Sequence, residues 1–332
     1  MIRKTAIRKM VTSISFGIFA MAMSVMASAA AVQDNFPSSP IRLVVGFPPP
    51  STTNTIARLL TQQLAVQMNV NVVVDNRIGA NGNIGAEYVA RSNPTGYTLL
   101  LNTSGVILTR ALGEKVNFDV LEDLVPVALI ASAPQWLVVH PAVPANNAAE
   151  FIAHLKTNPD KLAYGSSGVG NITHLGPLLF LQLNGLSALH VPYKGAAPAV
   201  VDLAAGRIQF RFSDMLSVMP LVKDKRLKVL AVAGLNRFPL MPDVPTLHES
   251  GMRGFEVGSW FGVMAPPKTS SATVKKLNVE ILRAMQEPEV KSQLARDGVT
   301  PLTSSPEEYG AYLRTELERW TKVIGSAGIK SE

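Results

Sequence analysis

Residues 40–60 read PIRLVVGFPPPSTTNTIARLL, and this stretch decides the fold class. Residues 41–45 are a short β-branched run of the kind that forms a buried strand. From residue 54 to residue 67, apolar side chains recur at the three- and four-residue spacing of an amphipathic helix. A loop of proline and small hydroxylated residues separates the two. A strand that leads through such a loop into a helix is the repeating unit of α/β proteins with parallel sheets.

The same alternation continues along the chain. The pattern predicts further strands at residues 71–74, 97–101, 127–130, 136–139, 162–164, 189–191, 208–212, 228–232 and 255–264. It predicts further helices at residues 86–91, 150–156, 175–183, 198–205, 271–285, 289–297 and 306–324.

The chain is expected to leave its first group of elements near Trp136 and to re-enter it near Glu256. Two such crossings make a natural hinge between two doubly wound α/β lobes. We assign residues 30–135 plus 256–332 to lobe one and residues 136–255 to lobe two. A crevice between two such lobes is a favoured place for a small ligand.

The first 29 residues have the order of a secretory signal peptide. Four basic residues and no acidic residue precede an apolar stretch from about residue 11 to residue 26, and small residues follow at 27–29. A permanent membrane anchor is the alternative, but the apolar stretch is rich in small residues and a polar segment follows it, not a basic one. We therefore expect export, with cleavage of residues 1–29.

Composition bounds the class of the exported chain. Four of the 31 basic residues and none of the 24 acidic residues lie in residues 1–29, so the remainder carries a net charge of +3. No cluster of Lys and Arg with interleaved aromatic residues is present, so we do not expect nucleic-acid binding. Without a cysteine, an exported chain has no disulfide framework and depends on a large buried core. About 300 residues suffice for two such domains.

Four predicted strand-to-helix junctions are rich in small hydroxylated or amide residues. They are residues 51–54, 102–105, 166–171 and 213–214. Backbone N–H groups at a helix N-terminus are unpaired and attract an oxygen anion, while small residues let a ligand approach them. Each Ser, Thr or Asn could instead be a simple helix N-cap. Because four such junctions lie at the carboxyl ends of strands, ligand binding and simple capping are equally well supported by the sequence.

The sequence contains no clear motif for binding a dinucleotide or a metal ion, or for catalysis by a serine nucleophile. Residues 79–85 lack the order of a dinucleotide-binding loop, so we interpret them as a close-packed turn. Scattered histidines and the absence of paired carboxylates argue against a metal site, and we expect no cofactor. Ser167, His174 and Asp214 could form a catalytic triad on paper, although no nucleophile elbow supports them. An exported serine hydrolase therefore stays as an alternative function.

Many short stretches resemble the extracytoplasmic receptors of tripartite tricarboxylate transporters, the Bug family. They occur in the family's order and together cover the chain from about residue 36 to residue 329. The stretches are residues 40–49, 55–58, 75–77, 82–86, 94–100, 164–168, 174–175, 190–195, 240–246 and 259–262.

This resemblance implies a periplasmic-binding-protein fold of type II, with two lobes joined by a two-strand hinge. It implies a periplasmic receptor without catalytic activity, which captures a small organic carboxylate (a di- or tricarboxylate or an aromatic acid) for the membrane subunits of a transporter. We expect a monomer. A sensor subunit that signals to another membrane partner is a further alternative.

The resemblance also implies which residues bind the ligand. In lobe one they are Phe47, Pro49, Ser51, Thr52, Asn54, Thr103 and Ser104. In lobe two they are Ser166, Ser167, Gly168, His174 and Asp214. The first loop departs from the family pattern, because Pro50 replaces a glycine and Asn54 replaces an aspartate. A neutral amide at residue 54 argues against an amino-acid ligand and in favour of a purely anionic or aromatic acid.

Overall fold

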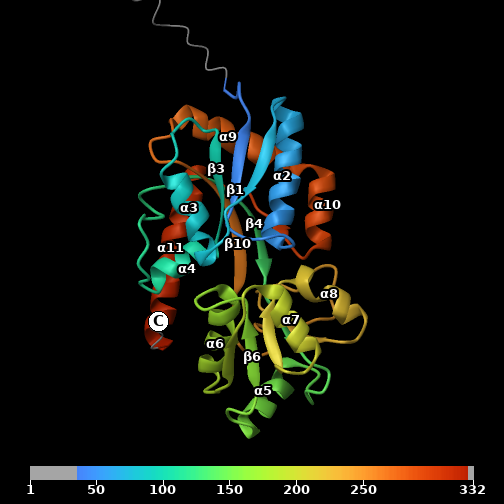
Figure 1. Cartoon of the computed structure of the whole chain (residues 1–332). Coiled ribbons are helices and arrows are strands. Elements are labelled where there is room, and N and C mark those ends of the chain that lie inside the picture. Colours follow the sequence, from blue (N-terminus) through green and yellow to red (C-terminus); the bar gives the residue numbers. More distant parts are fainter. Residues whose placement is uncertain (1–35, 328–332) are drawn as a thin grey trace, which may run out of the picture. The chain divides into compact units, whose positions relative to one another are not determined.

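The structure of the chain is a computed structural model that describes residues 36–327 (Figure 1). The described residues from Ser39 onward form one compact unit. The predicted signal peptide, residues 1–29, lies outside the described residues.

The strands are β1 (Ile41–Val45), β2 (Val72–Asn76), β3 (Thr98–Thr103), β4 (Val125–Pro134), β5 (Trp136–Val139), β6 (Ala163–Ser166), β7 (Leu189–Pro192), β8 (Phe210–Ser213), β9 (Lys228–Val232), β10 (Gly258–Ala265) and β11 (Thr300–Pro301). The helices are α2 (Thr52–Met68), the short 3-10 helix η1 (Ala80–Gly82), α3 (Asn83–Ala90), α4 (Ser104–Ala111), α5 (Ala148–Thr157), α6 (Ile172–Leu183), α7 (Ala196–Ala204), α8 (Met215–Lys223), α9 (Ser271–Gln286), α10 (Pro288–Arg296) and α11 (Pro306–Ala327). Every strand and helix that the sequence pattern predicts is present. The pattern assigned no range to η1, α4, α8 or β11.

The strands form two sheets. The first has the order β11-β4-β10-β3-β1-β2, and the second has the order β7-β6-β8-β5-β9. β1 is parallel to β2 and β3, and β6 is parallel to β7 and β8. The expectation of parallel sheets is wrong for the rest, because β10 runs antiparallel to β3 and β4, and β5 runs antiparallel to β8 and β9. β5 and β10 each follow directly after a passage between the sheets, and β11 also runs antiparallel to its neighbour β4.

The chain passes between the sheets twice, and hydrogen bonds join the two passages. Gln135 is the single residue between β4 and β5, and its N–H donates to the Val257 carbonyl at 2.9 Å. Ala233, just after β9, donates to the Gln135 carbonyl at 2.7 Å and accepts from the Val257 N–H at 2.9 Å. The passages lie where the sequence places the crossings. The lobe boundaries stay predictions, since the described residues from Ser39 onward cluster as one unit.

Alternation along β5 sends successive side chains to opposite faces of the second sheet. Leu137 and Val139 join one buried cluster, and Trp136 and Val138 join another. The first of these clusters also contains Trp320 of α11. All three tryptophans, Trp136, Trp260 and Trp320, are buried.

A buried carboxylate joins β10 to α11. The indole N–H groups of Trp260 and Trp320 both donate to Oε2 of Glu316 at 3.2 Å, and Arg319 donates to its Oε1 at 3.2 Å. Three donors satisfy a carboxylate that would otherwise be costly to bury. These hydrogen bonds hold strand β10 against helix α11.

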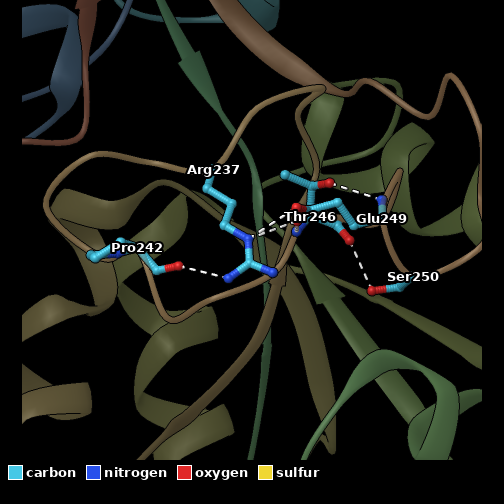
Figure 2. Close-up of polar contacts among 5 residues, drawn as sticks. All are labelled: Arg237, Pro242, Thr246, Glu249 and Ser250. Atoms are coloured by element: carbon cyan, nitrogen blue, oxygen red, sulfur yellow. Dashed lines mark hydrogen bonds and ion pairs between the residues drawn. The ribbon is translucent and has the colours of Figure 1, made fainter.

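The proline-rich loop between β9 and β10 is held by a capping box (Figure 2). The Thr246 N–H donates to Glu249 Oε2 at 2.8 Å, and the Glu249 N–H donates to Thr246 Oγ1 at 2.9 Å. Arg237 donates through Nε to the Glu249 carboxylate at 3.0 Å and through Nη1 to the Pro242 carbonyl at 2.8 Å. The Ser250 hydroxyl donates to the Thr246 carbonyl at 2.8 Å. These hydrogen bonds connect the two ends of the loop, from Arg237 to Ser250.

We expect Gly262→Ala to destabilise the protein, because a Cβ at Gly262 would overlap the buried ring of Tyr309. Overpacking of this kind costs roughly 1–3 kcal/mol of unfolding free energy. Gly310→Ala is the matched control, since its Cβ would lie 3.5 Å from Pro126 Cγ, an ordinary contact, within helix α11. Urea unfolding followed by circular dichroism measures both. Equal stability of the two variants would contradict the packing described here.

Candidate functional site

Two predicted ligand-binding loops leave the same edge of the first sheet. β1 and β3 are parallel and in register, with Val45 opposite Leu101, so α2 and α4 begin at neighbouring points. Ser51 caps α2 by accepting from the Asn54 N–H at 3.3 Å. Thr103 caps α4 by accepting from the Gly105 N–H at 3.3 Å. The capping interpretation is therefore correct for these two hydroxyls, and each accounts for only one of the unpaired N–H groups of its helix.

The side chain of Asn54 holds the loop after β1 in shape through hydrogen bonds. Its side-chain Nδ2 donates to the Phe47 carbonyl at 2.8 Å and to Ser51 Oγ at 3.1 Å. Its Oδ1 accepts from Nδ2 of Asn76 at 2.8 Å, and Asn76 also donates to the Phe47 carbonyl at 2.9 Å. The Asn54 side chain is buried and both of its N–H groups are used. Sequence reasoning missed Asn76, which reaches Asn54 from the end of the neighbouring strand.

The turn at residues 79–85 is close-packed, as the sequence predicts. A Cβ at Gly46 would overlap Gly82, and a Cβ at Gly82 would lie 3.3 Å from the Phe47 ring. Gly82 has φ +94°, which disfavours any other residue. The Phe47 ring therefore rests on this turn, and the exposed Pro49 follows it in the loop.

Thr52 and Ser104 occupy the first turns of α2 and α4, and both are buried. The Thr52 hydroxyl has no hydrogen-bond partner among the described residues. A buried hydroxyl without a hydrogen bond is unfavourable in a folded protein, and such groups commonly form a hydrogen bond with a ligand or a water molecule. Among the predicted ligand-binding residues of this loop, Thr52 is therefore the one whose buried hydroxyl makes no hydrogen bond to the described residues.

On the second sheet, Ser166 ends β6 and is fully buried. Its hydroxyl donates to the Gly168 carbonyl at 2.9 Å and accepts from the Gly168 N–H at 3.2 Å. Nε2 of His190 lies 2.7 Å from the same oxygen. Because a serine hydroxyl has one hydrogen, the histidine is the donor in that contact. Ser166 and Gly168 thus shape the loop that leads into α6.

His174 lies in a stack of aromatic rings. Its ring centroid is 4.0 Å from that of His190, which lies 4.9 Å from that of Tyr164. Nδ1 of His174 accepts from the Gly170 N–H at 3.1 Å. Burial, with the neighbouring His190, lowers the pKa of His174 to about 4. The ring is therefore neutral at pH 7 and carries its proton on Nε2.

Ser167 is half-buried and lies against an arginine that sequence reasoning missed. Its N–H donates to Thr173 Oγ1 at 2.8 Å, and its hydroxyl oxygen accepts from Nη2 of Arg211 at 3.3 Å. Arg211 lies in β8 and is only 1% exposed. Burial lowers the pKa of its guanidinium to about 10, so the group stays charged at neutral pH. The one signal in the sequence is a basic residue between Phe210 and Phe212 in a predicted strand.

Asp214 connects the start of α8 to the first passage between the sheets. Its Oδ1 accepts from Nε2 of Gln135 at 2.6 Å, and its side chain makes no cap bond to α8. Burial raises the pKa of Asp214, while the Gln135 hydrogen bond and the nearby Arg211 act in the opposite direction. Gln135 was also missed by sequence reasoning, since a lone glutamine carries no motif.

The geometry does not support the hydrolase alternative. The Ser167 hydroxyl faces Arg211, Nδ1 of His174 accepts from Gly170, and Asp214 is bound to Gln135. No hydrogen bond links any two members of this supposed triad in the part of the chain that the structure describes. A serine nucleophile needs a histidine that accepts its proton.

The two groups of predicted residues make no hydrogen bond to one another within residues 36–327. The loops beside them do meet, because Nδ2 of Asn81 donates to the Val169 carbonyl at 3.2 Å. A cavity of about 400 Å³ lies elsewhere, beside the passages, and its lining includes Ser132, Asn236 and Arg319. None of the predicted site residues lines it.

Among residues 36–327, no group of three or more His, Cys, Asp or Glu side chains is placed to hold a metal ion. None of the helices in residues 36–327 has the length and apolar character needed to span a bilayer.

Comparisons with known proteins agree with this geometry. A model of the tripartite tricarboxylate transporter family receptor matches residues 56–329. Protein BugT of Bordetella pertussis is 35% identical over 316 residues, which make up 95% of this chain and 96% of that protein. The structure of R. palustris Rpa4515 with adipate has a TM-score of 0.83 at 34% identity, and the match covers 89% of this chain and 99% of that one. MatC from Rhodopseudomonas palustris with bound malate has a TM-score of 0.79 at 29% identity, over 87% and 100% of the two chains.

The periplasmic binding protein BugD has a TM-score of 0.81 at 30% identity, over 90% of this chain and 100% of that one. The family and its solved members are solute-binding receptors and not enzymes. Their fold is the mixed α/β fold with two sheets described above, as the sequence predicts. The chain therefore belongs to the family of tripartite tricarboxylate transporter receptors.

Proposed function

We propose that this protein binds a small organic carboxylate at the loops that follow β1, β3, β6 and β8, and delivers it to the membrane subunits of a tripartite tricarboxylate-type transporter. The observation that carries the proposal is the buried Thr52 hydroxyl, which has no partner among the described residues and lies in the first turn of α2. The relatives with adipate and with malate support a carboxylate as the ligand class.

The physical basis is the pairing of an anion with unused donors. The N-termini of α2 and α4 lie at one edge of the first sheet, and each carries the positive end of its helix dipole. The caps at Ser51 and Thr103 satisfy one N–H group each, so further backbone donors remain available to a carboxylate. The Thr52 hydroxyl adds a donor that can rotate toward the anion.

We further propose that residues 1–29 are cleaved on export and that the mature receptor acts as a monomer. The passages at Gln135 and Val257 would serve as the hinge between the two predicted lobes. A ligand that contacts both lobes only when they close would favour the closed state by its difference in affinity for the two states.

The ligand class can be tested by a thermal-shift panel of dicarboxylates, tricarboxylates, aromatic acids, amino acids and neutral sugars. We expect acids to raise the unfolding temperature, because a ligand that binds only the folded state stabilises it by mass action. Stabilisation by neutral sugars alone would show that the carboxylate assignment is wrong.

Thr52→Val is expected to weaken binding of the best acid in that panel by roughly tenfold, because it removes one hydrogen bond to a charged group. It should not lower the stability of the free protein, since the hydroxyl has no partner there. Thr61→Val is the control, because Thr61 is also buried in α2 but donates to the Arg58 carbonyl at 3.2 Å. Isothermal titration calorimetry measures the affinities. An unchanged affinity of the Thr52→Val variant would count against the site.

The low pKa of His174 predicts a loss of stability in acid. Between pH 6.5 and about 4, the unfolded chain binds a proton at this ring that the folded chain does not. The free energy of unfolding should therefore fall by up to roughly 3 kcal/mol across that window and stay level above it, as far as this residue is concerned. His174→Gln should flatten the dependence, whereas His154→Gln on α5 should not. Urea unfolding from pH 7 to pH 4 checks this, and parallel curves for the wild type and His174→Gln would refute it.

A further inference from the structure

We propose that the cavity of about 400 Å³ beside the two passages is a second binding site, which takes a small organic cation. Glu256 pairs with the ammonium group of this ligand, and Trp260 and Tyr312 contact its apolar body. None of the predicted carboxylate-binding residues lines the cavity, so the proposal goes beyond the receptor function and does not depend on it. The preferred ligand class is a primary amine that carries a compact apolar group.

The cavity has the size of a small-molecule site, and distant parts of the chain build it. Such sites commonly enclose roughly 300 to 1,000 Å³, a range that includes this cavity. Its wall comes mainly from the end of β4, residues 233–236 after β9, residues 256–260 and helix α11. The hydrogen bonds that Ala233 and Val257 make at the passages join three of these segments. Hydrogen-bonded backbone therefore forms one side of the cavity.

Three charged side chains line the cavity, and two of them are paired with each other. Arg319 Nη1 donates to Glu316 Oε1 at 3.2 Å, and Glu316 Oε2 accepts from two buried indole N–H groups. Arg319 Nη2 donates to the backbone carbonyl of Glu256, so both ends of the guanidinium are engaged. None of the ion pairs among the described residues includes Glu256. The exposed Glu256 carboxylate therefore gives the cavity a negative charge that a cation entering from solvent would match.

Two aromatic rings in the same cavity suit the body of an organic cation. The rings of Trp260 and Tyr312 meet edge to face, with centroids 5.7 Å apart and planes at 87°. Burial and the carboxylates of Glu316 and Glu256 raise the pKa of Tyr312, against the opposing effect of Arg319. An ammonium group that lies between a carboxylate and aromatic rings gains both a charge-assisted hydrogen bond and cation–π attraction. A neutral molecule gains neither, and an anion is repelled by Glu256.

A matched pair of probes tests the requirement for a positive charge. Benzylamine and benzyl alcohol share an apolar body, and only the amine is a cation at neutral pH. Tryptophan fluorescence would follow titrations of the protein with each probe, since Trp260 lines the cavity. We expect benzylamine to bind at least roughly threefold more tightly than benzyl alcohol, the scale of one exposed ion pair. Equal affinity for the two probes, or no binding of benzylamine, would overturn the proposal.

Substitutions in the cavity wall locate the binding. Glu256→Gln removes the unpaired charge at an exposed side chain and should abolish the preference for benzylamine. Tyr312→Leu removes an aromatic ring and should weaken benzylamine binding, with circular dichroism confirming its fold. Glu318→Gln is the matched control, because Glu318 is an exposed carboxylate of α11 that does not line the cavity. It should leave both affinities unchanged.

The outcomes separate this site from the proposed carboxylate site. If Tyr312→Leu does not fold, Glu256→Gln decides alone, since it exchanges one exposed side chain for another of the same shape. A preference for benzylamine that survives in Glu256→Gln, or that Glu318→Gln removes equally, would overturn the proposal and leave carboxylate binding intact. Failure of every acid in the thermal-shift panel would reject the proposed function without affecting this inference.

Discussion

The double passage of the chain between its two sheets is the constraint on which the rest of the structure depends. Gln135, Ala233 and Val257 exchange backbone hydrogen bonds at this point, so the two passages and the end of β9 are held as one unit. β5 and β10 follow directly after the passages, and each runs antiparallel to both of its neighbours in its sheet. The side chain of Gln135 extends the constraint to Asp214 at the start of α8. Backbone geometry at the passage is thereby coupled to a residue of the predicted site.

The polar residues of the candidate site fall into two kinds, which the hydrogen bonds separate. Ser51, Thr103, Asn54, Ser166 and His174 use their side chains to hold the loops in shape. The Thr52 hydroxyl makes no hydrogen bond to the described residues, whereas the hydroxyls of Ser51, Thr103 and Ser167 accept hydrogen bonds there and donate none. A loop that braces itself presents such groups in a fixed direction, which lowers the entropic cost of binding. Most of the small polar residues that suggested a ligand site therefore hold the loops in shape.

The hydrogen bonds within the first loop also explain why an asparagine can replace the family's aspartate at residue 54. In the sequence, Asn54 appears as a neutral replacement for a ligand-binding carboxylate. In the structure its amide bridges Phe47, Ser51 and Asn76. A carboxylate at residue 54 could not donate to the Phe47 carbonyl, so the amide fits the conformation of this particular loop. The preference for a purely anionic or aromatic acid therefore stays a prediction, with the unpaired Thr52 hydroxyl as its structural support.

Sequence patterns predicted most of the strands and helices, the four loops at strand ends and the points where the chain changes sheet, but they assigned no range to η1, α4, α8 or β11. Periodicity and turn chemistry are local properties, and the ends of β1 at Ile41 and Val45 and of β9 at Lys228 and Val232 could be read from a few neighbouring residues. Tertiary structure alone decided that Asn76 braces Asn54, that Arg211 supports Ser167 and that Gln135 holds Asp214. These pairs are separated by many residues along the chain, and no periodic pattern marks them. Only the packing of strands and helices brings such donors and acceptors together, because burial obliges each polar group to find a partner wherever the fold places one.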